Sequence, residues 1–147
     1  MINENLKLSG QLSIVLKDKA GNVKEQRDVK NLVVNTGLAY IASRMKDTTL
    51  SAMSHMGVGS GTTNPAAGNT ALETALGARV ALTSTTVTAN AIEYVATFGA
   101  GSGTGAVTEA GIFNASSGGT LLCRTEFAVI NKGASDSMTI TWTVTVS

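Results

Sequence analysis

The feature that most constrains this chain is a segment near its end in which apolar residues and threonines alternate without a break. From residue 138 to residue 146, every second position is apolar and every position between is threonine. Side chains of a strand point to opposite faces with a period of two, whereas a helix would scatter this pattern around its circumference. The segment therefore predicts a half-buried strand with Trp142 on its inner face. Its outer face is uncharged and consists of Thr139, Thr141, Thr143 and Thr145.

Length and composition limit the classes of protein that the chain can belong to. Its 147 residues predict one domain, residues 1–147, with a hydrophobic core. The net charge is only +1, whereas a nucleic-acid-binding protein usually has a strongly basic face, so we expect no nucleic acid partner. No segment approaches the ~20 apolar residues that span a bilayer, and the first residues lack the profile of a signal peptide. We therefore expect no membrane association and synthesis in a cytoplasm.

The charged residues are concentrated in the first third of the chain. Residues 1–47 carry 8 of the 11 basic and 5 of the 10 acidic residues. Charged residues make up only 14% of the whole chain, against about a quarter in ordinary domains. Charge keeps free proteins apart in solution, and it is depleted at the cores of interfaces. The charge-poor remainder is therefore expected to be covered in part by other copies or other proteins.

Residues 1–34 predict a charged β-hairpin. Leu12, Ile14 and Leu16 alternate with Ser13, Val15 and Lys17, which is typical of a half-buried strand. A turn follows at residues 18–22, and a charged strand then returns. We expect the cations of this hairpin to face solvent or to lie on a polar partner.

The only helix that the sequence predicts with a clear pattern covers residues 36–46. Leu38, Ile41, Ala42 and Met45 have the spacing of one helical face, and Asn35 or Thr36 is a suitable N-cap.

The body, residues 54–147, predicts short strands joined by loops rich in glycine. Strands are expected at 55–59, on both sides of Asn90 between 79 and 98, and as a hairpin at 107–114 and 120–127. One helical turn is expected at 71–76. The count of about eight short strands with one helix predicts a mainly β fold, a β-sandwich with the jelly roll as one form of it.

Candidate catalytic residues are few. His55 is the only histidine and Cys123 the only cysteine, too few for a zinc site and without an evident partner for nucleophilic catalysis. We expect His55 to make one hydrogen bond and Cys123 to be a buried strand residue. The glycine-rich residues 99–105 lack a P-loop pattern and predict a flexible connection between strands. Glu93, Glu109 and Glu126 are expected to face solvent or to pair with Arg79 or Arg124.

Several segments resemble virion structural proteins of tailed bacteriophages. Residues 29–37 (VKNLVVNTG), followed by the predicted helix, are similar to the opening of small proteins of this class. Residues 56–72 (MGVGSGTTNPAAGNTAL) resemble their strand, Gly-Thr loop and Ala-Leu turn. A hairpin of head-decoration and tail-fibre or baseplate components resembles residues 108–115, 119–122 and 125–127. The resemblance covers about residues 29–147 and carries over no catalytic residue.

The resemblance implies a structural protein of the virion and not an enzyme. The first expectation is a capsid decoration, or cement, protein that binds the outside of the head, bridges major capsid protein subunits and forms homo-oligomers, with a trimer favoured. The alternative is a tail fibre, baseplate or adaptor component, in which case a host glycan is a candidate ligand. No cofactor is expected. The candidate interface residues are Lys17, Lys19, Lys24, Arg27, Lys30, Thr139, Thr141, Thr143 and Thr145.

Overall fold

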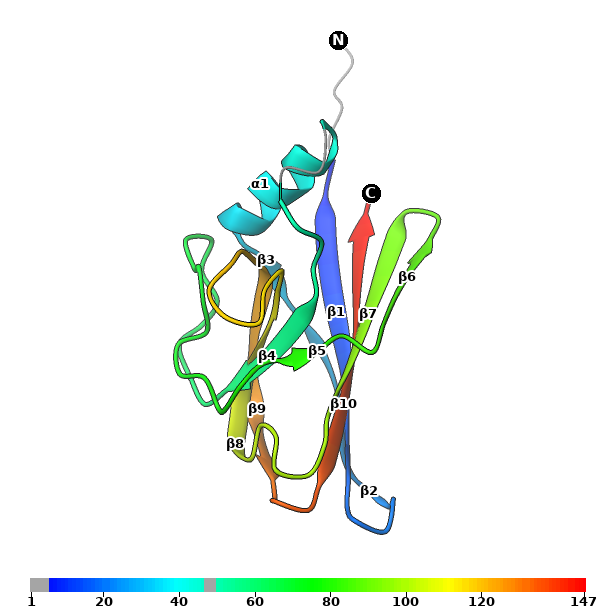
Figure 1. Ribbon diagram of the computed structural model, residues 1–147, viewed down its shortest axis with the longest axis vertical. Coiled ribbons are helices and arrows are strands. Elements are labelled where there is room, and N and C mark those ends of the chain that lie inside the picture. The colour runs from blue at the N-terminus through cyan, green and yellow to red at the C-terminus, as the bar shows by residue number, and fades with distance from the viewer. Residues whose placement is uncertain (1–5, 47–49) are drawn as a thin grey trace.

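The computed structural model describes residues 6–46 and 50–147, which form a β-sandwich of two antiparallel five-stranded sheets (Figure 1). This confirms the expected fold class. Sheet A has the order β2 (Val23–Lys30), β1 (Leu8–Lys17), β10 (Ser137–Val146), β7 (Ala91–Phe98) and β6 (Ser84–Thr88). Sheet B has the order β3 (Leu32–Val33), β9 (Leu121–Lys132), β8 (Gly105–Phe113), β4 (His55–Gly59) and β5 (Val80–Ala81).

The described part of the chain has ten strands, two more than the sequence predicted. Strands β3 and β5 have two residues each, too short to produce an alternating pattern. The hairpins β1–β2, β6–β7 and β8–β9 each remain within one sheet.

Strand β1 lies inside sheet A, between β2 and β10. It pairs with β10 over its whole length, from Leu8 opposite Val146 to Lys17 opposite Ser137. The predicted hairpin is thus present, and its first strand is part of the central sheet. The turn at its end is closed by Asp18, whose Oδ1 accepts the backbone N–H groups of Ala20 and Asn22 at 2.9 Å each.

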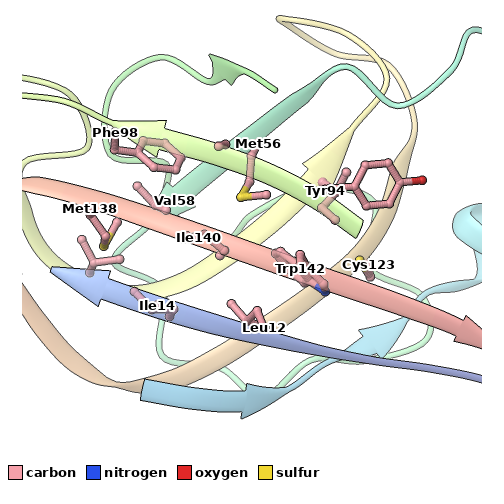
Figure 2. Packing of buried hydrophobic residues seen from close by; sticks show 14 of the residues in the cluster. Leu12, Ile14, Met56, Val58, Tyr94, Phe98, Cys123, Met138, Ile140 and Trp142 are labelled. Carbon is pink, nitrogen blue, oxygen red and sulfur yellow. The ribbon is translucent and has the colours of Figure 1, made fainter. Parts of the chain in front are cut away.

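The core lies between the two sheets (Figure 2). The inward residues of β10 are apolar, and Trp142 and Ile140 are both 0% exposed. They pack in one cluster with Leu12 and Ile14 of β1 and with Cys123 of β9. Alternation along β1 and β10 therefore placed these side chains correctly, and Cys123 is buried in a strand as expected for a free cysteine.

Helix α1 (Asn35–Arg44) covers one end of the sandwich (Figure 1), and it differs in detail from the predicted helix. Its N-cap is Val34, which makes no side-chain cap hydrogen bond. The hydroxyl of Thr36 instead donates to the carbonyl of Leu121 in β9. The predicted capping by Asn35 or Thr36 was therefore wrong, because a contact with the sheet occupies the Thr36 hydroxyl.

The buried face of α1 also differs from the predicted face. Leu38 is 45% exposed and Met45, just beyond the helix, is 85% exposed, whereas Gly37 and Tyr40 are buried. A β-carbon on Gly37 would overlap the carbonyl oxygen of Leu122. Glycine thus allows the helix to lie directly on the backbone of β9, and this close contact sets the face that the helix buries.

The helical turn predicted at residues 71–76 is absent, and this segment runs beside β4 instead. Leu76 N–H donates to Val58 O at 2.9 Å, and Ala75 forms an isolated bridge with Gly59. The segment belongs to a long loop, residues 60–79, that covers part of the outer face of sheet B. Its Leu72 packs on the outward-facing Phe113 and Leu121 in a second, smaller apolar cluster.

Candidate functional site

The outer face of sheet A is a broad polar surface that crosses all five strands, and we call it the threonine face. It is formed by the outward-pointing residues of 26–30 in β2, 9–15 in β1, 139–145 in β10, 91–97 in β7 and 84–88 in β6. Most of these residues are threonine, serine or glutamine. The charged residues among them are Asp28, Lys30 and Glu93, and Lys17 continues the outward-pointing residues of β1 at the hairpin end.

The four threonines predicted as interface residues form the centre of this face. Thr139, Thr141, Thr143 and Thr145 are all half-buried between the outward residues of β1 and β7. The hydroxyls of Thr139 in β10 and Thr97 in the adjacent strand β7 form a hydrogen bond of 3.0 Å. Hydroxyls both donate and accept hydrogen bonds, so the face offers partners to either kind of group.

The five predicted cations of the hairpin divide into two groups. Lys24 forms an ion pair of 2.8 Å with Asp136, and Arg27 donates to Ala128 O at 2.8 Å and to Glu25 at 3.0 Å. These two side chains connect β2 to other parts of the chain. The remaining cations are Lys17, Lys19 and Lys30. All three are exposed, and none forms an ion pair within residues 6–46 and 50–147.

Asp136 and Lys132 fasten the loops at the hairpin end of the sandwich. The side-chain hydrogen bond from Lys24 and the backbone N–H of Gly133 hold the pKa of Asp136 below its usual value. Burial lowers the pKa of Lys132, whose Nζ donates to Gly99 O at 2.9 Å. The glycine-rich connection at 99–105 is therefore anchored at its first residue.

The long loop is fixed to sheet B by a buried ion pair between Glu109 in β8 and Arg124 in β9. The carboxylate of Glu109 is 0% exposed and lies 2.8 Å from the guanidinium of Arg124. It also accepts the loop N–H groups of Gly61, Glu73 and Thr74 at 2.7–3.0 Å. The pairing with Arg124 was one of the two outcomes expected for Glu109. The loop donors could not be predicted, because no pattern in residues 60–79 indicates a partner.

The candidate catalytic residues do not come together. His55 makes the one hydrogen bond that was expected, between Nδ1 and the hydroxyl of the adjacent Ser54 at 2.8 Å. Cys123 is buried in the core, and burial raises the pKa of its thiol. Glu93 is exposed on the threonine face and Glu126 is half-buried. In the described chain, no group of three or more histidine, cysteine, aspartate or glutamate side chains is placed to hold a metal ion.

An apolar pocket of about 300 Å³ lies between α1 and the adjacent ends of the two sheets. Tyr40 of the helix and Tyr94 of β7 line it, and burial raises the pKa of Tyr94. Sequence reasoning did not indicate this pocket, since its lining comes from segments that only the tertiary fold brings together. Its other lining residues are Leu8, Ile41, Arg44, Ala52, Met53, Thr85, Ile92, Leu122, Val144 and Val146.

No family model, curated protein or solved structure matches this chain. Within the described residues, no helix has the length and apolar character needed to cross a membrane. A proposal for the function therefore rests on the surface chemistry of the chain.

Proposed function

We propose that the chain is a decoration, or cement, protein of a tailed-bacteriophage head. In this role it binds the outside of the assembled shell and bridges neighbouring major capsid protein subunits. The observation that supports it best is the threonine face, a surface of five strands that carries only three charges. Such a surface is more typical of a protein covered by neighbours than of one free in solution.

The proposed contact with the capsid is made by the hairpin end of the sandwich. Lys17 and Lys19 are exposed on both sides of the Asp18 turn, and the rigid sheet behind them fixes their position. Such a site suits an acidic patch on the major capsid protein. Because binding would favour the assembled shell over its separated subunits, it would stabilise the head by mass action.

The proposed role is structural, and the protein would reside on the outer surface of the virion after synthesis in the host cytoplasm. The glycan-binding form of the tail alternative gains no support from the aromatic residues. Trp142 is 0% exposed, and Tyr94 and Tyr40 are 4% and 7% exposed. A sugar that stacks on an exposed ring would find none of these three available.

The test is cosedimentation of the purified protein with phage heads that have been stripped of their accessory proteins. We expect saturable binding of many copies per head and a higher temperature of head disruption. Lys17→Glu/Lys19→Glu should weaken this binding at least about tenfold, because two cations are replaced by anions at the contact. Lys7→Glu is the matched control, since Lys7 is exposed at the opposite end of β1.

Failure of the wild-type protein to bind heads, together with binding to isolated tails, would overturn the proposal and favour the tail alternative. Equal loss of head binding in Lys7→Glu and in the hairpin variant would show that the hairpin is not the contact.

A further inference from the structure

The charges on the threonine face occupy defined positions in its register. Lys30 in β2 is opposite Gln11 in β1, which is opposite Thr143 in β10, which in turn is opposite Glu93 in β7. Lys30 and Glu93 therefore lie in the same row, three strands apart. At about 4.8 Å per strand this separation is roughly 14 Å, too far for an ion pair within one chain.

Glu93 is an exposed carboxylate without a counterion in the described part of the chain. Its neighbours on the face are Thr143 and Thr86 across the strands, and Ala91 and Val95 along its own strand. None of these is a cation. The threonine face thus carries one anion and one cation in the same row that are both unpaired, and its third charge, Asp28, lies in the neighbouring row.

We propose that two copies of this chain pack through their threonine faces, about a twofold axis that runs along the strands between β1 and β10. This axis places β2 of one copy over β7 of the other at the same height. Lys30 then faces Glu93 of the second copy, and the symmetry of such an interface repeats the pair. Gln11 faces Thr143 in the same way.

The geometry of sheet packing is compatible with this pair. Sheets that stack face to face cross at about 30°, which would displace the two side chains by roughly 4 Å along the strands at this distance from the axis. A lysine side chain is long enough to span that displacement. Asp28 would face Val95, because both lie in the row of Thr141, so no like charges are directly opposite each other.

The rest of the face is complementary to itself. Its hydroxyl and amide groups can each donate and accept, so those of the four overlapping strands can pair with the same kinds of group on a second copy. With the axis between β1 and β10, the strands β2, β1, β10 and β7 of the two copies overlap, and β6 lies beyond the edge of the partner sheet. Four strands and four rows of outward residues cover roughly 500 Å² per copy, or about 1,000 Å² in a dimer, which is the size of a weak, transient interface. We therefore expect a reversible dimer with a dissociation constant of roughly micromolar order.

This inference does not rest on the proposed capsid role, and it differs from the trimer that the resemblance implies. The first measurement is sedimentation velocity of the purified full chain, without heads, over a range of concentrations. The wild-type protein should be a monomer at low concentration and a dimer at high concentration. Lys30→Glu and Glu93→Lys should each weaken dimerisation at least about tenfold, because symmetry repeats the repulsive contact. Lys30→Glu/Glu93→Lys should restore it to within a few-fold of wild type.

Lys19→Glu is the matched control, since it reverses a charge at the turn without changing the face. Circular dichroism of each variant verifies the fold, and Lys30→Gln and Glu93→Gln provide milder changes if a reversal perturbs it.

A monomer at all concentrations, a trimer, or a double variant as weak as the singles would overturn the proposal. Restoration by Lys30→Glu/Asp28→Lys instead would also overturn it, because that result requires an axis across the strands. Dimerisation that Val87→Lys abolishes and Lys30→Glu leaves intact would indicate pairing through the β6 edge.

Discussion

Glu109 is the residue on which the attachment of the long loop depends. Glu109→Ala leaves the guanidinium of Arg124 buried without its carboxylate, and it removes the acceptor of three loop N–H groups. Removal of one partner of a buried ion pair costs about 3–5 kcal/mol. In a chain of this length, that loss corresponds to a fall in Tm of about 10 °C. Thermal unfolding followed by circular dichroism measures it.

The control for this prediction is Glu126→Ala, because Glu126 is opposite Glu109 in the same hairpin but only half-buried. We expect it to change stability by at most about 0.5 kcal/mol. Glu109→Ala/Arg124→Met should recover part of the loss, since no uncompensated buried charge remains. A double variant less stable than Glu109→Ala would contradict this account of the pair.

Asp136 should make stability depend on pH. Its pKa is lower in the folded protein than in the unfolded chain, chiefly because Lys24 donates a hydrogen bond to it. The ionised carboxylate thus stabilises the fold above the unfolded pKa, and this contribution is lost as the pH falls through the folded pKa. Asp136→Asn should therefore lower Tm at pH 7, and the difference from wild type should shrink below pH of about 4.

The measurement is Tm against pH for wild type, Asp136→Asn and the control Asp28→Asn. Asp28→Asn makes the same charge change on β2, where its carboxylate forms no ion pair within the described residues. Parallel curves for wild type and Asp136→Asn across this range would show that the ion pair with Lys24 contributes nothing to stability.

At the scale of elements, helix α1 depends on the absence of a side chain at Gly37. Alanine is the better helix former by about 1 kcal/mol, so helix propensity alone predicts that Gly37→Ala stabilises the protein. The new β-carbon, however, would overlap the carbonyl oxygen of Leu122 and push the helix away from β9. We expect a net loss of about 1–3 kcal/mol, as for other overpacked sites, measured by urea unfolding.

Ala39 provides the opposite comparison in the same helix, because it is exposed. Ala39→Gly should cost about 1 kcal/mol through propensity alone. If Gly37→Ala proved more stable than wild type, the helix would not be held by the contact with Leu122.

The elements differ in how far the sequence predicts them. The β8–β9 hairpin was predicted because the turn residues 115–119 separate two strands. Strand β10 was predicted because alternation reports directly which side chains face the core. The same pattern does not say which strands are neighbours, so the composition of the threonine face across five strands could not be predicted. The turn at 71–76 had helical composition, but Glu109 binds the N–H groups of Glu73 and Thr74 from another element. A tertiary contact of this kind outweighs a weak local preference.

At the scale of the whole molecule, strands β1 and β10 bring the two ends of the described chain together in one sheet. Strand β1 pairs with β10 in the middle of sheet A, so the N-terminal segment completes the sheet that carries the threonine face. One apolar cluster then includes inward residues from both sheets. Because the sheets share this core, neither can expose its inner face without the other losing its contacts.

This shared core predicts a single cooperative unfolding transition, and the chain carries a natural probe in each sheet. Trp142 is the only tryptophan and lies in sheet A, and Cys123 is the only cysteine and lies in sheet B. Both are 0% exposed, and burial raises the pKa of the thiol, so Cys123 should not react while the protein is folded.

In urea, the red shift of Trp142 emission, the labelling of Cys123 by a thiol reagent and the loss of far-UV circular dichroism should share one midpoint. Cys123→Ala supplies the background for labelling. Labelling of Cys123 at a urea concentration that leaves Trp142 buried would show that sheet B opens alone, and that the two sheets do not form one cooperative unit.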